Sequence, residues 1–122
     1  MKEDIEIFGV RVVDDRLTGE YDSFKIGEIF FIDVFQPKKN YFVPRFHTAT
    51  GVFTVLLTLE SCKFAFPEFK QLDNGNLVNI KRIKMVTETK YAITAHFADN
   101  AATCNVARVK KKHVEHLIQK KA

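Results

Sequence analysis

Apolar and polar positions alternate at the start of the chain with the two-residue period of β-strands. Residues 5–13 form the first predicted strand, which ends at the turn residues Asp14-Asp15. Residues 21–25 predict a short edge strand. The strongly apolar run 26–35 predicts another strand, which ends at the polar segment 37–40. Aromatic and β-branched residues dominate these stretches and favour a β-rich first half.

A hairpin and a short helix follow. Residues 41–45 and 52–57 flank the turn at Thr48-Ala49-Thr50-Gly51 and predict the hairpin. Thr58 is then suited to cap a helix, because its hydroxyl can accept from the first free backbone N–H groups. This helix places Cys62 on its apolar side and ends before Pro67, after about two turns.

Short strands and strong turn signals return in the second half of the chain. The turn signal Asp73-Asn74-Gly75-Asn76 is the clearest of these. Extended segments are predicted at 69–72, 77–80, 83–86, 91–97 and 102–106, and 83–86 and 91–97 are expected to pair as a hairpin around the polar tip Thr87-Glu88-Thr89-Lys90. From Val109 onward, an apolar stripe of Val114, Leu117 and Ile118 predicts a closing helix. The expected fold is mainly β, with small antiparallel sheets, one short internal helix and a C-terminal helix.

Length and composition restrict the classes of protein that remain. The chain has 122 residues, 46% of them apolar, which suits one folded domain and excludes a two-domain enzyme. It lacks both a run of about 20 apolar residues and a recognisable signal peptide, so we expect a cytoplasmic protein without membrane insertion. Two cysteines, Cys62 and Cys104, are too few for a disulfide framework. Cys104 lies close to Arg108, which leaves open an exposed, electropositive thiol as well as an inert buried one.

Charge is divided unevenly along the chain. Residues 1–61 contain 7 basic and 10 acidic side chains, a net −3, whereas residues 62–122 contain 12 basic and 5 acidic, a net +7. The basic excess is concentrated after residue 101. This asymmetry favours a polyanionic partner, most simply nucleic acid, while a solvated charged face is the structural alternative.

Motifs for catalysis or cofactor binding are absent from the sequence. It has no Gly-rich phosphate loop, no G-x-S-x-G motif and no paired zinc-binding cysteines. His113 and His116 have a spacing that could suit a metal, but the lysines just before them would repel a cation. We therefore expect a non-enzymatic protein without a metal or cofactor. Asn79 lies within an apolar strand, where a buried amide would serve the backbone.

Several blocks in this sequence resemble LytTR-type DNA-binding domains. The block at 69–83, which contains Val78-Asn79 and Ile83, is similar to the family's central loop and strand. The blocks Phe97-Ala98-Asp99-Asn100 and Val106-Ala107-Arg108 resemble its later strand, its turn and its "Val-Ser-Arg" motif. Ile29-Phe30-Phe31-Ile32 and Thr58-Leu59 match earlier blocks. The resemblance covers about residues 22–120.

Some loop positions depart from the family pattern. Gln71, Asp73 and Gly75 stand where the family usually has a basic residue, His and Ser, and Ala107 replaces the Ser before Arg108. Asp73 would repel a phosphate. It would therefore either accept a hydrogen bond from a cytosine amino group or belong to a loop that is held differently.

The resemblance implies a LytTR-like β-sandwich that binds double-stranded DNA through its loops and last helix. It assigns residues 22–122 to this domain and residues 1–21 to an N-terminal strand or extension, which leaves no room for the receiver domain that usually precedes it. The expected partners are DNA, a second copy on DNA and a regulatory protein. The DNA-binding residues expected are Lys70, Gln71, Asp73, Asn74, Lys81, Asn100, Asn105, Arg108, Lys110, Lys111 and Lys112.

A protein-interaction module is the alternative from another functional class. An adaptor or antagonist of this kind would use the Phe-rich first half of the chain. The expected contact patch is Phe30, Phe31, Phe35, Tyr41 and Phe42, unless these side chains fill the core.

Overall fold

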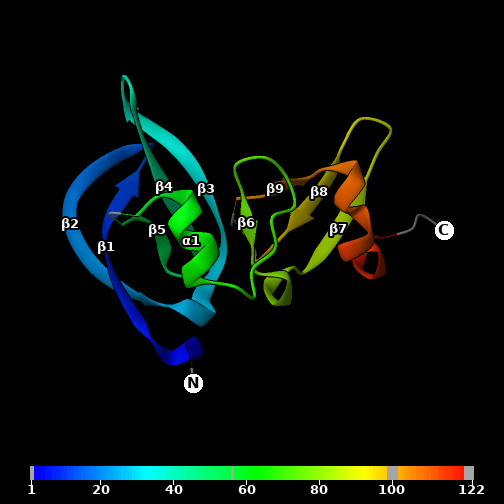
Figure 1. Ribbon diagram of the computed structural model, residues 1–122, viewed down its shortest axis with the longest axis horizontal. Coiled ribbons are helices and arrows are strands. Elements are labelled where there is room, and N and C mark those ends of the chain that lie inside the picture. Colours follow the sequence, from blue (N-terminus) through cyan, green and yellow to red (C-terminus); the bar gives the residue numbers. More distant parts are fainter. Residues whose placement is uncertain (1, 56, 99–101, 120–122) are drawn as a thin grey trace.

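The computed structural model describes residues 2–55, 57–98 and 102–119. Two antiparallel sheets and one α-helix form its framework (Figure 1). The strands are β1 (Glu6–Val13), β2 (Arg16–Lys25), β3 (Ile29–Lys38), β4 (Tyr41–Thr48), β5 (Gly51–Thr54), β6 (Leu77–Val78), β7 (Met85–Glu88), β8 (Ile93–His96) and β9 (Cys104–Val106). The helical elements are α1 (Leu59–Ala65) and the 3-10 segments η1 (Lys2–Asp4), η2 (Ile26–Glu28), η3 (Ile80–Arg82), η4 (Arg108–His113) and η5 (Glu115–Leu117).

The larger sheet has the strand order β2-β1-β5-β4-β3-β6. Asp14 and Asp15 join β1 to β2 with φ angles of 51° and 59°, a conformation that Asp tolerates better than most residues. The predicted first strand and its turn are therefore confirmed. The predicted edge strand is longer than expected, since β2 begins at Arg16 and pairs along β1.

The smaller sheet has the order β7-β8-β9 and lies beside β6, away from the β1–β2 hairpin (Figure 1). The predicted hairpin in this region is confirmed, with Glu88 opposite Ile93 at its closed end. β9 then pairs with β8, and Ala95 lies opposite Cys104. These pairings place the chain segment after residue 106 next to the hairpin tip.

Helix α1 covers one face of the larger sheet. The Oγ1 atom of Thr58 accepts a hydrogen bond from the backbone N–H of Ser61 at 3.0 Å, which confirms the predicted cap. Cys62 is fully buried against the sheet, and Phe46 and Phe53 lie in the same cluster. Burial raises the pKa of the Cys62 thiol to about 11.

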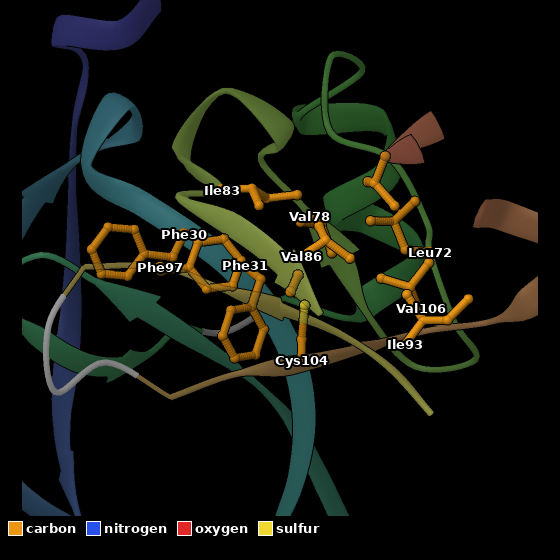
Figure 2. Packing of buried hydrophobic residues seen from close by; sticks show 12 residues of the cluster. Phe30, Phe31, Leu72, Val78, Ile83, Val86, Ile93, Phe97, Cys104 and Val106 are labelled. Atoms are coloured by element: carbon orange, nitrogen blue, oxygen red, sulfur yellow. The ribbon is translucent and has the colours of Figure 1, made fainter. Parts of the chain in front are cut away.

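The apolar run 26–35 is explained by two cores that share strand β3. Ile29 and Ile32 pack in the cluster beneath α1, whereas Phe30 and Phe31 pack in the cluster of the smaller sheet. The pairing of β3 with β4 shifts register between residues 29 and 31, so consecutive Phe residues can enter one core. Figure 2 shows their rings gathered with Phe97 at one end of this cluster.

The end of the described chain is not a regular α-helix. Residues 108–117 form η4 and η5, two 3-10 segments that meet at Val114. Val114 is fully buried and belongs to the core of the smaller sheet. The bond from Gln119 N to Val86 O, 2.8 Å long, then ties this segment to β7. Val114 and Leu117 pack on the same core and are three residues apart, a spacing that suits 3-10 turns better than the continuous helix that the sequence predicts.

Candidate nucleic-acid interface

The predicted recognition loop, residues 71–76, is held by a buried amide. The Oδ1 atom of Asn76 accepts hydrogen bonds from the N–H groups of Leu72 at 3.1 Å and Asp73 at 3.0 Å. Its Nδ2 atom donates to the carbonyl oxygen of Asn105 at 3.0 Å. Gly75 turns the chain with a φ of 79°, which a residue with a side chain rarely adopts. The Asn76 side chain thus fixes the conformation of the loop.

The loop and strand β9 form one surface. The Ala107 N–H donates to the Leu72 carbonyl at 2.6 Å, next to the contact between Asn76 and Asn105. Asn105 is exposed between the buried Cys104 and Val106, so its side chain points outward from β9. A hollow of about 500 Å³ lies here and is lined by residues of the loop, β9 and β3. Asn74 and Asn105 therefore share one side of the molecule.

Carboxylates, rather than cations, are the charged groups of this hollow. Asp33 and Asp73 both line it, and Asp73 Oδ1 accepts a hydrogen bond from the Asn74 N–H at 2.8 Å. That bond ties the Asp73 side chain to its own loop. Both readings of Asp73, a contact to a cytosine amino group and a loop held differently, stay predictions.

Cys104 lies beneath this surface and is not an exposed thiol. It is 7% exposed, and burial together with the charges of Asp33 and Asp73 raises its pKa to about 12. The alternative of an accessible electropositive thiol is therefore wrong. Arg108 follows β9 but points to the β7–β8 hairpin instead of toward the sulfur.

Arg108 and Lys111 share one carboxylate at the hairpin. The Nζ atom of Lys111 is 3.0 Å from Glu88 Oε2, and Arg108 Nη1 is 3.5 Å from the same oxygen. Within the part of the chain that the structure describes, Lys112 and the half-buried Lys110 make no such ion pair. The basic segment is thus partly neutralised by the protein itself.

Lys81 stands apart from the other predicted residues. It belongs to η3, which lies at the lower edge in Figure 1, opposite the loop above β6. Its Nζ atom is 3.2 Å from Glu3 Oε1, in an ion pair with η1. Lys70 is exposed where the loop begins, and its backbone pairs with that of Val78. Asn100 lies outside the described residues.

The structure brings together most of the predicted loop and β9 residues. Gln71, Asp73 and Asn74 belong to the loop, and Asn105 and Arg108 come from β9 and its continuation. Tyr91 and Lys90, at the tip of the β7–β8 hairpin beside Arg108, are residues that the sequence treated only as part of a turn and strand. The sequence signal available for them was an aromatic residue next to a polar turn.

Among residues 2–55, 57–98 and 102–119, no group of three or more His, Cys, Asp or Glu side chains is placed to hold a metal ion. No helix in the same ranges is long and apolar enough to span a membrane.

The fold is the fold of a known class of DNA-binding domain. A solved structure, the LytTr DNA-binding domain of a methyl-accepting/DNA response regulator from Bacillus cereus, superposes with a TM-score of 0.64. The match covers 89% of this chain and 95% of that one, at 13% sequence identity. The chain therefore has a LytTR-type fold. No family model matches the sequence, and no curated protein matches it.

Proposed function

We propose that this chain is a sequence-specific regulator of transcription that binds double-stranded DNA. The observation that carries the proposal is the surface made by loop 71–76, Asn105 and Arg108 on a LytTR-type fold. A solved structure with that fold is described as a DNA-binding domain. A cytoplasmic location and action without catalysis or a cofactor are parts of the same proposal.

In this proposal the exposed amides read bases. Asn74 and Asn105 each carry a donor and an acceptor, and such amides pair with base edges in the major groove. Gln71 belongs to the same loop and adds a third amide. Asp73 supports the loop from within, since its carboxylate accepts from the Asn74 N–H.

Basic side chains would neutralise phosphates in this proposal. Lys112 and Lys110 are the most available, and Lys70 stands at the start of the loop. Arg108 and Lys111 would contribute less, because Glu88 already offsets their charge. Lys81 would contribute least, since its ion pair with Glu3 lies at the other edge.

The test is DNA binding at several salt concentrations, with duplexes selected from a random or genomic library. About six phosphate contacts give a slope of log K against log salt near −5. Lys112→Ala should lower the magnitude of this slope by about 1. Lys39→Ala, in the turn between β3 and β4, is the matched control and should leave it unchanged. A flat slope, or equal affinity for unrelated duplexes, would contradict the proposal.

Selected sites would also report on the proposed partners. Two copies bound together would give paired half-sites with a fixed spacing, and a single copy would give one unpaired site. A homodimer on DNA and a regulatory protein partner extend the proposal beyond the domain itself.

A protein-interaction module is the second candidate function. Phe8 is 70% exposed, Tyr21 76% and Phe42 66%, and an apolar groove runs between β1, β2 and β4. The expected patch is corrected, because Phe30, Phe31 and Phe35 are buried and only Tyr41 and Phe42 of it are exposed. Absence of DNA binding, combined with loss of a stoichiometric protein partner in Phe8→Ser, would favour this candidate.

A further inference from the structure

The tip of the β7–β8 hairpin is held by hydrogen bonds within its own turn. The Thr89 N–H donates to the Ala92 carbonyl at 2.8 Å and closes the turn. The Thr89 hydroxyl oxygen accepts from the N–H groups of Tyr91 and Ala92, each at 3.1 Å. Lys90 and Tyr91 therefore stand at the apex of an ordered turn, where their backbone is already fixed.

Arg108 fastens this tip to the end of β9. Its Nη2 atom donates to the Lys90 carbonyl at 2.9 Å and to the Thr89 carbonyl at 3.3 Å, and Nη1 approaches Glu88 at 3.5 Å. The guanidinium thus contacts three consecutive residues of the tip. These hydrogen bonds hold the hairpin tip beside the end of β9.

Tyr91 is the most exposed large hydrophobic side chain among the described residues, at 85%. Its ring borders a hollow of about 260 Å³ that Asn105 and Arg108 also line. Lys90 Nζ lies 5.8 Å from the ring centroid. Asn105 also lines the hollow at loop 71–76, so the two hollows are parts of one surface.

We propose that Tyr91 and Lys90 form a second DNA contact, in which the ring packs on a deoxyribose and the ammonium pairs with the adjoining phosphate. This inference rests on the proposed function. In a duplex the bases are stacked inside, so an exposed ring beside the groove meets the sugar edge first. The nearby cations Lys90, Arg108 and Lys111 outnumber Glu88, which complements a polyanion. Ordering of the tip before binding reduces the entropy lost on contact.

The contact is tested by substitutions at the apex, measured on a selected duplex. Tyr91→Ala should weaken binding about tenfold. Tyr91→Phe should bind like the wild type, because the ring is retained. Lys90→Ala should lower the magnitude of the slope of log K against log salt by about 1, whereas Tyr91→Ala should leave this slope unchanged. Tyr21→Ala, which changes another strongly exposed tyrosine, on β2 of the other sheet, is the matched control.

The outcomes separate this inference from the proposed function. Lack of DNA binding by the wild type would refute the function itself. If the wild type binds DNA and Tyr91→Ala binds it as tightly as Tyr21→Ala does, the inference alone is overturned. Tyrosine emission gives a second readout that needs no loss of the Tyr91 ring, because the chain has three tyrosines and no tryptophan. In the double variant Tyr21→Phe/Tyr41→Phe, DNA should protect the Tyr91 emission from quenching by acrylamide. Quenching that DNA leaves unchanged would also overturn the inference.

Discussion

The side-chain amide of Asn76 donates to the backbone carbonyl of Asn105 at 3.0 Å and so joins loop 71–76 to strand β9. These residues are 29 positions apart in the chain. The same Asn76 amide accepts from the N–H groups of Leu72 and Asp73 within the loop. One buried side chain therefore fixes both the shape of the loop and its position beside Asn105.

Asn76→Ala should lower the free energy of unfolding by about 2–3 kcal/mol. The substitution leaves two loop N–H groups and the Asn105 carbonyl without their partner, and an unsatisfied buried polar group is costly. Urea unfolding measures the loss. Asn74→Ala is the control, because Asn74 is exposed in the same loop, and its effect should stay within about 0.5 kcal/mol. Equal stability of the two variants would show that the hydrogen bonds of Asn76 do not hold the loop in place.

Glu88→Gln should strengthen DNA binding about threefold to tenfold at low salt. The change removes the negative charge that Arg108 and Lys111 share, so two cations become available to phosphates. The slope of log K against log salt should steepen in the same variant. Glu115→Gln removes an exposed negative charge of the nearby segment and should have a smaller effect. Weaker binding by Glu88→Gln would mean that its ion pairs order the surface more than they mask it.

Asp33 should make folding sensitive to acid. Burial opposes its ionisation, but hydrogen bonds from His47 at 3.0 Å and from Arg45 outweigh burial, so the pKa of Asp33 lies below its ordinary value. The stabilisation is therefore complete above the unfolded carboxyl pKa of about 3.9. It is lost as the pH falls through the lower folded value.

Asp33→Asn should accordingly cost about 2–3 kcal/mol at neutral pH, since hydrogen bonds to charged groups are lost and Arg45 keeps its charge. The difference from wild type should shrink as the pH falls through the folded pKa of Asp33. Unfolding by urea at a series of pH values measures both effects. Glu20→Gln on β2 controls for the loss of one negative charge at an exposed position. A difference that stays constant down to the lowest pH would contradict this account.

Both thiols should resist alkylation in the folded protein. Cys62 and Cys104 are buried, with pKa values raised to about 11 and about 12, so very little thiolate exists near neutral pH. Iodoacetamide labelling followed by mass spectrometry should show two modified cysteines only after denaturation. Rapid labelling of Cys104 in the native state would show that β9 opens locally.

The sequence by itself determined most of the elements and the type of fold, although the closing helix that it predicted is two 3-10 segments. Alternation marked β1, a polar tip between two extended segments marked the β7–β8 hairpin, and Thr58 together with Pro67 delimited α1. These signals act between near neighbours in the chain. The LytTR resemblance, based on short blocks, agrees with the fold of the superposed domain. The mainly β architecture and the structural role of Asn79, whose amide donates to the Ile29 carbonyl at 3.0 Å, were likewise predicted.

Only the tertiary structure decided which residues share a surface. Burial of Phe30 and Phe31 on one side of β3 and of Ile32 on the other depends on a register shift and on two separate cores. Lys81 was grouped with Arg108 by charge, but folding pairs it with Glu3 at the opposite edge.

The same holds for Asn76 and for the apex of the β7–β8 hairpin. The sequence marked Asn76 as a turn residue, and its bond to Asn105 exists because two distant segments pack together. Arg108 likewise appeared as a free cation until β9 placed it against Lys90 and Glu88. Local patterns determine how each segment folds, whereas charge pairing and exposure depend on contacts between segments far apart in the chain, which local patterns do not encode.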